Sequence, residues 1–282
     1  MKKINVVGFG DESKLVLACA KKLGIEPQFV EEGEYRRGEM KLIGPAKVSH
    51  SALVVANIWE APKSLFRVLS LAHGLRHAGV RRLSLIAPWI AYGRQDRPTR
   101  PGDEATGLMV GKLLSAMFDS IVTLDAHSEA FVESFKGKLE DVLPWQGIEV
   151  EEKIDLVAAP DHGAVSRASL AADRLGVPFI VIEKKRVGRK VLAKLPSGTK
   201  VKDARILLVD DMADSGETLK AAASVLKKAK ARSVAATVSH TFDLLALHAK
   251  LTPEVDSVDC YFDHKSHLLA EAALDLLVSA MK

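Results

Sequence analysis

Short apolar runs rich in β-branched residues alternate with longer helix-forming stretches along almost all of this 282-residue chain. Buried parallel strands appear as short apolar runs, and parallel strands need a long connection, usually a helix, between them. The alternation therefore predicts an α/β fold of mostly parallel sheets flanked by helices. The expected strands are Ile4–Gly8, Leu53–Asn57, Leu83–Pro88, Ser120–Leu124, Leu156–Pro160, Phe179–Glu183, Ile206–Asp210 and Ser233–His240. The expected helices lie near 12–22, 62–78, 104–117, 163–175, 217–230 and 267–281.

Two stretches of the chain, 52–89 and 206–240, share the plan strand, loop, helix, strand. Any two such units look alike to some degree, but the repeat favours two similar domains. Pro144 and Gly147 interrupt the pattern between them. We expect domains at 1–146 and 147–282, an arrangement that allows the last helix to pack back on the first domain.

The composition excludes several classes of protein. With 48% hydrophobic and 27% charged residues, the chain is globular rather than fibrous or disordered. Aromatic residues make up only 5% and the net charge is +4, which argues against a nucleic acid partner bound by base stacking. No run is apolar and long enough for a membrane span or a signal peptide, and Cys19 and Cys260 show no disulfide or metal pattern. We expect a cytoplasmic protein with no membrane partner.

One segment, 207–218 (LLVDDMADSGET), carries the strongest chemical signal. Its apolar run ends in Asp210 and Asp211, and a glycine-containing turn then leads into a helix. Amide groups of a loop and a helix start favour an anion, and hydroxyls from Ser215 and Thr218 add donors. The two carboxylates suit sugar hydroxyls or a metal ion. A single acidic pair would indicate only an ordinary strand-to-helix turn, but the whole segment predicts a sugar-phosphate pocket.

Other polar segments also follow expected strands: RQDR at 94–97, TLDAH at 123–127 and PDHG at 160–163. Ligands of open α/β sheets bind at the carboxyl ends of the strands, where these segments lie. Arg94 and Arg97 suit phosphate because the guanidinium group donates two parallel hydrogen bonds. His127 with Asp161 forms a sparse set for a nucleotide-bound Mg²⁺, which takes few protein ligands. A solvated loop and a structural histidine are the plain alternatives.

The basic run KKRVGRK, 184–190, follows another expected strand. It fits either a solvated hairpin or a mobile flap that brings cations to the charge developing on a transferred phosphoryl group.

In this order, RQDR, TLDAH, PDHG, EKKR and DDMADSGET resemble the motifs of ribose-phosphate diphosphokinases, a family of the phosphoribosyltransferase-like superfamily. The resemblance implies two phosphoribosyltransferase-like domains in a homo-oligomer, a dimer or larger. It implies transfer of the diphosphoryl group of ATP to the anomeric hydroxyl of ribose 5-phosphate, with Mg²⁺ as cofactor. Lys184 and Arg186 match the family's catalytic flap, and His127 and Asp161 its metal ligands. The positions implied for ATP are Tyr35, Arg37, Glu39, Arg94, Gln95 and Arg97, and those for ribose 5-phosphate are Asp210, Asp211, Asp214, Ser215, Gly216, Glu217 and Thr218.

Two positions depart from the family pattern. Arg37 stands where the early loop usually carries an aspartate, which reverses the charge and leaves no acceptor for an adenine amino group. Glu217 stands in a turn that usually reads Thr-Gly-Gly-Thr, so it adds a carboxylate near the 5-phosphate.

Both departures support a second hypothesis, a non-catalytic regulatory or associated subunit that binds ribose phosphate without turnover. A phosphoribosyltransferase is a third, although the duplicated domain and the RQDR segment count against it.

Overall fold

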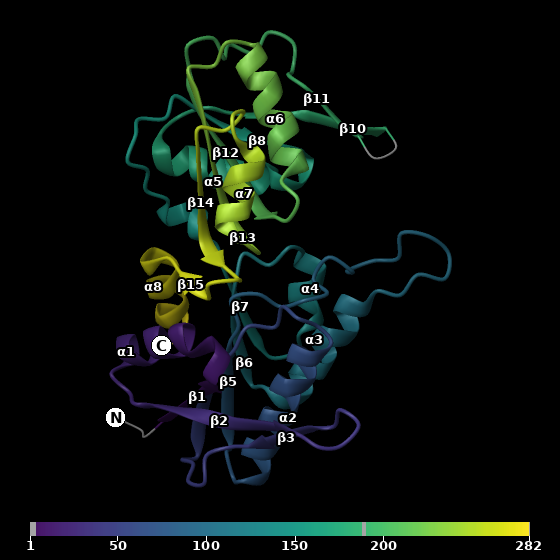
Figure 1. Ribbon diagram of the computed structural model, residues 1–282, viewed down its shortest axis with the longest axis vertical. Coiled ribbons are helices and arrows are strands. Elements are labelled where there is room, and N and C mark those ends of the chain that lie inside the picture. Colours follow the sequence, from purple (N-terminus) through teal and green to yellow (C-terminus); the bar gives the residue numbers. More distant parts are fainter. Residues whose placement is uncertain (1–3, 188–189, 282) are drawn as a thin grey trace. The chain divides into compact units, whose positions relative to one another are not determined.

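The expected alternation is present in the structure, a computed structural model that describes residues 4–187 and 190–281 and no side chain from 185 to 192. The strands form two mostly parallel sheets flanked by helices, which confirms the α/β fold class. The chain divides into two units, Met1–Val142 with Ala273–Lys282, and Leu143–Ala272 (Figure 1). The division thus falls between Val142 and Leu143, slightly before the expected position, and the last helix belongs to the first unit.

The sheet of the first unit has the order β3-β2-β1-β4-β5-β6-β7, in which the β2–β3 pair is antiparallel and the other described pairs are parallel. Its strands are β1 (Ile4–Phe9), β2 (Pro27–Glu34), β3 (Met40–Ile43), β4 (Ser51–Val55), β5 (Arg82–Ile86), β6 (Ser120–Leu124) and β7 (Lys138–Val142). Its helices are α1 (Ser13–Leu23), α2 (Lys63–His77), α3 (Thr106–Met117), α4 (Glu129–Ser134) and α8 (Glu271–Ala280), with a 3₁₀ turn at Gly10–Glu12.

Alternate residues of β1 face different helices. Val7 and Phe9 join a core made with apolar residues of α2, α3 and α4. On the opposite face, Gly8 lies so close to α1 that an added Cβ would come 2.3 Å from a methyl group of Val16. Glycine at this position therefore lets α1 pack directly on the sheet.

The second unit is built on the order β15-β14-β13-β12-β8-β9, antiparallel only between β14 and β15 among the described pairs. The strands are β8 (Leu156–Ala159), β9 (Phe179–Val181), β12 (Arg205–Ala213), β13 (Ser233–Thr241), β14 (Ser257–Asp263) and β15 (Leu268–Leu269). The helices are α5 (Val165–Leu175), α6 (Glu217–Lys228) and α7 (Leu244–Leu251), with 3₁₀ turns at Pro144–Gly147 and His162–Ala164. Apolar residues of α6 and α7 form one core with β8, β12 and β13. A separate hairpin, β10 (Glu183–Val187) with β11 (Lys190–Lys194), projects from this unit (Figure 1).

Several elements of the structure were not predicted from the sequence. β2 is mostly exposed, and Val30 is its one buried residue. Its sequence therefore has no continuous apolar run that would predict a strand. β7 and β14 also mix charged and apolar residues. The last helix starts at Glu271 rather than near 267, because Leu268–Leu269 pairs with β14. Strands of this kind are formed by their sheet neighbours rather than by a local pattern.

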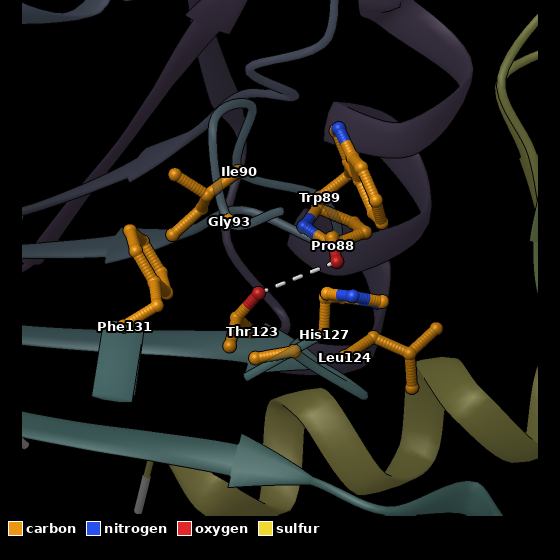
Figure 2. Close-up of a pocket in the computed structure, with 9 residues that line it drawn as sticks. Pro88, Trp89, Ile90, Gly93, Thr123, Leu124, His127 and Phe131 are labelled. Carbon is orange, nitrogen blue, oxygen red and sulfur yellow. Dashed lines mark hydrogen bonds between the residues drawn. The ribbon is translucent and has the colours of Figure 1, made fainter. Parts of the chain in front are cut away.

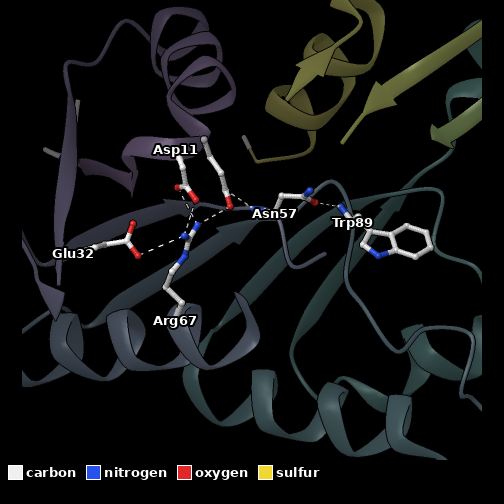
Figure 3. A network of polar contacts seen from close by, with 6 residues as sticks. Asp11, Glu32, Asn57, Arg67 and Trp89 are labelled. Atoms are coloured by element: carbon white, nitrogen blue, oxygen red, sulfur yellow. Dashed lines mark hydrogen bonds and ion pairs between the residues drawn. The ribbon is translucent and has the colours of Figure 1, made fainter. Parts of the chain in front are cut away.

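A buried polar network holds the carboxyl edge of the first sheet (Figure 3). Arg67 donates to Asp11 and to Glu12 at 2.8 Å each, and its guanidinium carbon lies 3.9 Å from the centre of the Phe9 ring. Glu12 in turn accepts the backbone N–H of Asn57 at 2.7 Å. The network thereby ties the ends of β1 and β4 to helix α2.

Within residues 4–187 and 190–281, none of the helices combines the length and the apolar character that a bilayer crossing would require.

Candidate active site

The sugar-phosphate segment begins inside a strand rather than after it. β12 continues past both aspartates to Ala213, whereas we expected a strand end at Asp210. The extension exists because β13 is equally long: Met212 and Ala213 pair with His240 and Thr241, and the Thr241 hydroxyl donates to the Ala213 carbonyl at 3.1 Å. The acidic pair is therefore fixed on a rigid strand.

Asp210 and Asp211 are held by local hydrogen bonds. The Asp210 carboxylate accepts from the Asp211 N–H at 3.0 Å, and the Asp211 carboxylate accepts from the Met212 N–H at 2.9 Å. Burial, and then the negative charge of Asp211, hold the pKa of Asp210 well above its usual range. A carboxyl group of this kind both donates and accepts, which suits sugar hydroxyls.

The turn after β12 leads directly into helix α6. Gly216 precedes the helix with a φ of 77°, and an added Cβ would lie 3.0 Å from Leu247 and 3.1 Å from Leu251. Both the backbone angle and the packing therefore require glycine. Asp214 and Ser215 are exposed. The backbone amides of the turn and of the first helical residues are the donors expected to bind a phosphate.

Glu217 is the first residue of α6 and is exposed to solvent. A carboxylate in the first turn interacts favourably with the helix dipole. The exposed position keeps its charge solvated.

Lys184 joins two of the predicted segments within the second unit. Its ammonium group donates to the Asp161 carboxylate and, at 3.3 Å, to the Thr218 hydroxyl. The other Asp161 oxygen accepts from the Gly163 N–H at 2.8 Å and so caps the 3₁₀ turn. The start of the hairpin, the PDHG loop and the first turn of α6 therefore meet at one place, while the side chain of Arg186 lies outside the described part of the chain.

Arg167 belongs to this site but had no role in the sequence-based prediction. It lies in the first turn of α5, it is 8% exposed, and its guanidinium group is 3.9 Å from the Asp211 carboxylate. It also donates to the Gly163 carbonyl at 3.2 Å. Its position in the helix that follows PDHG, on the face turned to the sheet, is the signal that could have indicated it.

In the first unit, the RQDR segment lies in a loop between β5 and α3. Arg94, Gln95 and Arg97 are all exposed and so are accessible to a ligand. The Gly107 N–H donates to the Gln95 carbonyl at 2.9 Å, which fastens the loop to the start of α3. An added Cβ on Gly107 would lie only 2.5 Å from the Tyr92 carbonyl oxygen.

Replacing Gly107 with alanine should therefore displace the RQDR loop. Because a backbone carbonyl yields poorly, we expect a loss of roughly 2 kcal/mol of stability, together with weaker ATP binding. Gly74→Ala, in helix α2, is the matched control: an added Cβ meets nothing within 4 Å, so this helical substitution should be neutral or slightly stabilising. Urea denaturation and nucleotide titration of both variants test the claim, and equal behaviour of the two would contradict it.

His127 lies beside the RQDR loop. It lines a small pocket with Pro88, Gly93 and Thr123, in which the Thr123 hydroxyl donates to the Pro88 carbonyl (Figure 2). A Cβ on Gly93 would come within 4.0 Å of the His127 Cβ. The structure thus brings this predicted metal ligand next to the predicted ATP loop.

The hairpin turn with Tyr35, Arg37 and Glu39 lies elsewhere in the same unit. It connects β2 to β3 at one side of the sheet, so β1 and β4 separate it from the strands that precede RQDR and TLDAH. The Tyr35 N–H donates to the Glu39 carbonyl at 2.7 Å, and Tyr35 is 54% exposed. Arg37 has a φ of 76°, a left-handed conformation that aspartate and glycine adopt more readily than arginine.

The predicted metal ligands His127 and Asp161 belong to different units. In the part of the chain that the structure describes, no group of three histidine, cysteine or acidic side chains is arranged to hold a metal ion. The Asp161 carboxylate is the oxygen type that Mg²⁺ prefers, and Mg²⁺ keeps water and substrate phosphates as further ligands. The Asp161 carboxylate therefore suits a metal carried by a nucleotide rather than a closed protein site.

Two mostly parallel sheets flanked by helices, with two aspartates in a central strand and a glycine-containing turn that leads into a helix, are the features of the phosphoribosyltransferase-like class of α/β proteins. The family models agree: residues 143–264 match the phosphoribosyl transferase domain, and 4–117 match the N-terminal domain of ribose phosphate pyrophosphokinase.

Comparison with known proteins identifies the family. The chain is 30% identical over 234 residues to a ribose-phosphate pyrophosphokinase of Pyrococcus furiosus, covering 81% of this chain and 84% of that protein. It is 30% identical over 233 residues to the Thermococcus kodakarensis protein of the same name, covering 81% of each. The fold matches that of a phosphoribosylpyrophosphate synthetase from Mycobacterium smegmatis with a TM-score of 0.78 at 22% identity, covering 92% of this chain and 95% of that one. The chain belongs to the ribose-phosphate pyrophosphokinase family.

Proposed function

We propose that this protein transfers the diphosphoryl group of ATP to ribose 5-phosphate, giving phosphoribosyl diphosphate and AMP. The observation that carries the proposal is the meeting of Lys184, Asp161 and Thr218 in the second unit. A diphosphoryl transfer onto a sugar phosphate requires a cation, here from the hairpin, a carboxylate suited to a metal, and the start of the phosphate-binding helix. A subunit that only binds ribose phosphate would not need the cation or the carboxylate.

The second unit is the proposed ribose 5-phosphate site. Asp210 and Asp211 accept hydrogen bonds from the ribose hydroxyls. The turn from Asp214 to Thr218 binds the 5-phosphate through its amides and hydroxyls. The exposed position of Glu217 supports this assignment, because its charge does not need to be buried beside the phosphate.

The first unit is the proposed ATP site. Arg94, Gln95 and Arg97 would contact the nucleotide, and His127 would be a ligand of the Mg²⁺ that ATP carries. Asp161 of the second unit is the other proposed ligand, and the cation would neutralise phosphate charge. In the reaction, the anomeric hydroxyl gives its proton to solvent as its oxygen bonds to the β-phosphorus. The bond from that phosphorus to the oxygen shared with the α-phosphate breaks, and AMP leaves. The protein mainly aligns the reactants and stabilises charge, so no nucleophilic side chain is needed.

We further propose a cytoplasmic homo-oligomer. The hairpin turn with Tyr35, Arg37 and Glu39 is separated from the RQDR loop by two strands of its own sheet. A second copy of the chain could bring that turn to the nucleotide.

The test is a product assay with ATP, Mg²⁺ and ribose 5-phosphate, followed by phosphorus NMR. We expect AMP and phosphoribosyl diphosphate to appear in equal amounts. If ribose 5-phosphate binds but neither product forms with any nucleoside triphosphate, the second candidate, a regulatory subunit, replaces the first. The cation at Arg37 is the observation that favours that candidate.

Replacing Arg37 with aspartate should improve the use of ATP if this turn reads adenine. The carboxylate can accept from the adenine amino group, and aspartate tolerates the left-handed backbone. We expect the KM for ATP to fall by roughly three- to tenfold, the value of about one hydrogen bond. Arg36→Asp, an equal charge change at an exposed neighbour in the same turn, is the control. If both variants shift the KM for ATP equally, the change comes from the altered charge of the turn and not from a hydrogen bond to adenine.

A further inference from the structure

Both oxygens of the Asp161 carboxylate accept a hydrogen bond from the protein itself. One oxygen accepts from the Gly163 N–H at 2.8 Å, and the other accepts from Lys184. Both side chains of the ion pair are only partly exposed, 23% for Asp161 and 21% for Lys184. Solvent and salt therefore screen this pair less than a surface pair.

A divalent cation and the Lys184 ammonium group compete for the Asp161 carboxylate. Both are attracted to its negative charge, and two positive charges beside one carboxylate oxygen repel each other. Binding of a cation to Asp161 therefore weakens the ion pair and favours the departure of Lys184. The second contact of Lys184, the Thr218 hydroxyl at 3.3 Å, is a neutral and longer hydrogen bond that does not replace the ion pair.

Lys184 is also the second residue of the projecting hairpin. It pairs with Ala193 in the β10–β11 ladder. The ion pair to Asp161 thus fastens the base of this hairpin to the loop after β8, and its loss frees both the ammonium group and the hairpin base.

We propose that the Asp161–Lys184 ion pair is a latch: it holds Lys184 in the ligand-free protein until a divalent cation takes its place on Asp161. Lys184 is thereby delivered to the substrate phosphates only when the cation is bound. The inference rests on the proposed function for the roles of Asp161 and Lys184, and it adds that the two residues compete.

The first test measures binding of Mn²⁺, a divalent ion that also takes oxygen ligands, by electron paramagnetic resonance on the full chain without nucleotide or sugar. Lys184→Met should tighten Mn²⁺ binding by roughly tenfold, because it removes the competing cation from a partly buried carboxylate. Asp161→Asn should weaken binding. Lys194→Met, which removes the same charge from an exposed position of the same hairpin, should leave the affinity within about twofold of wild type.

The second test follows the reactivity of the Lys184 amine with an acetylating reagent, using peptide mass spectrometry and Lys194 as the internal reference. Mg²⁺ alone should accelerate modification of Lys184 several-fold in the wild type, and Asp161→Asn should show the fast rate without Mg²⁺.

The latch is overturned if Lys184→Met binds Mn²⁺ no more tightly than Lys194→Met, or if Asp161→Asn leaves Mn²⁺ binding unchanged. The product assay on the same wild-type preparation separates this failure from failure of the proposed function. Product formation with unaltered Mn²⁺ affinity in Lys184→Met removes only the latch. Absence of product removes the proposed activity, while the Mn²⁺ titrations still decide whether the two residues compete.

Discussion

Lys184→Ala is expected to lower kcat by about 10³-fold, the loss typical of removing a charge that stabilises a transition state. The ammonium group lies between the proposed metal ligand Asp161 and the start of the phosphate-binding helix at Thr218. From there it can meet negative charge that develops on the transferred diphosphoryl group. Affinity for ribose 5-phosphate should change little, because the turn before α6 supplies most of the donors to that phosphate.

Steady-state kinetics and equilibrium binding of ribose 5-phosphate to the variant provide the measurement. Lys194→Ala, at the last residue of β11 and exposed, is the control and should retain wild-type rates. Unchanged turnover in Lys184→Ala would remove the hairpin from the mechanism. A loss confined to ribose 5-phosphate affinity would instead make Lys184 a substrate-binding residue. Arg186→Ala should repeat the loss of kcat, an expectation that comes from the family resemblance alone.

The stability of the first unit should fall as the pH rises through the range from about 4.5 to 7. Burial raises the pKa of the Glu12 carboxyl from 4.5 to about 7, against the opposing effects of the Asn57 N–H and of Arg67. Because the folded state binds this proton more tightly than the unfolded chain, the stabilisation is fully present below pH 4.5 and is lost above pH 7. A shift of this size corresponds to roughly 3 kcal/mol.

Glu12→Gln isolates this contribution, since glutamine does not titrate. We expect its free energy of unfolding, measured with urea by circular dichroism and tryptophan fluorescence, to vary less between pH 5 and 7.5 than that of the wild type. Glu31→Gln, an exposed position on β2, should keep the wild-type profile. Parallel profiles for wild type and Glu12→Gln would show that Glu12 keeps its charge throughout, with Arg67 compensating for burial.

Part of the fold and of the proposed site could be predicted from local sequence signals. The segments around Asp210, Gly216 and Thr218 were identifiable because strand, turn and helix signals lie within a few residues of one another. The core strands of both sheets were identifiable for the same reason: their apolar runs are continuous, as burial on both faces requires. Mostly exposed strands such as β2 were missed because their pairing partners, rather than their own residues, make them strands.

The sequence alone determined the fold class, the positions of the central strands and the residue types that gather at their carboxyl ends, because these depend on local periodicity and turn chemistry. Only the tertiary structure decided that Lys184 contacts Asp161 and Thr218, residues 23 and 34 positions away along the chain. The same holds for Arg167 beside Asp211, and for the close approach that requires glycine at position 107. The physical reason is that such contacts form between separate elements, so their partners and distances are set by how the elements pack on the sheet.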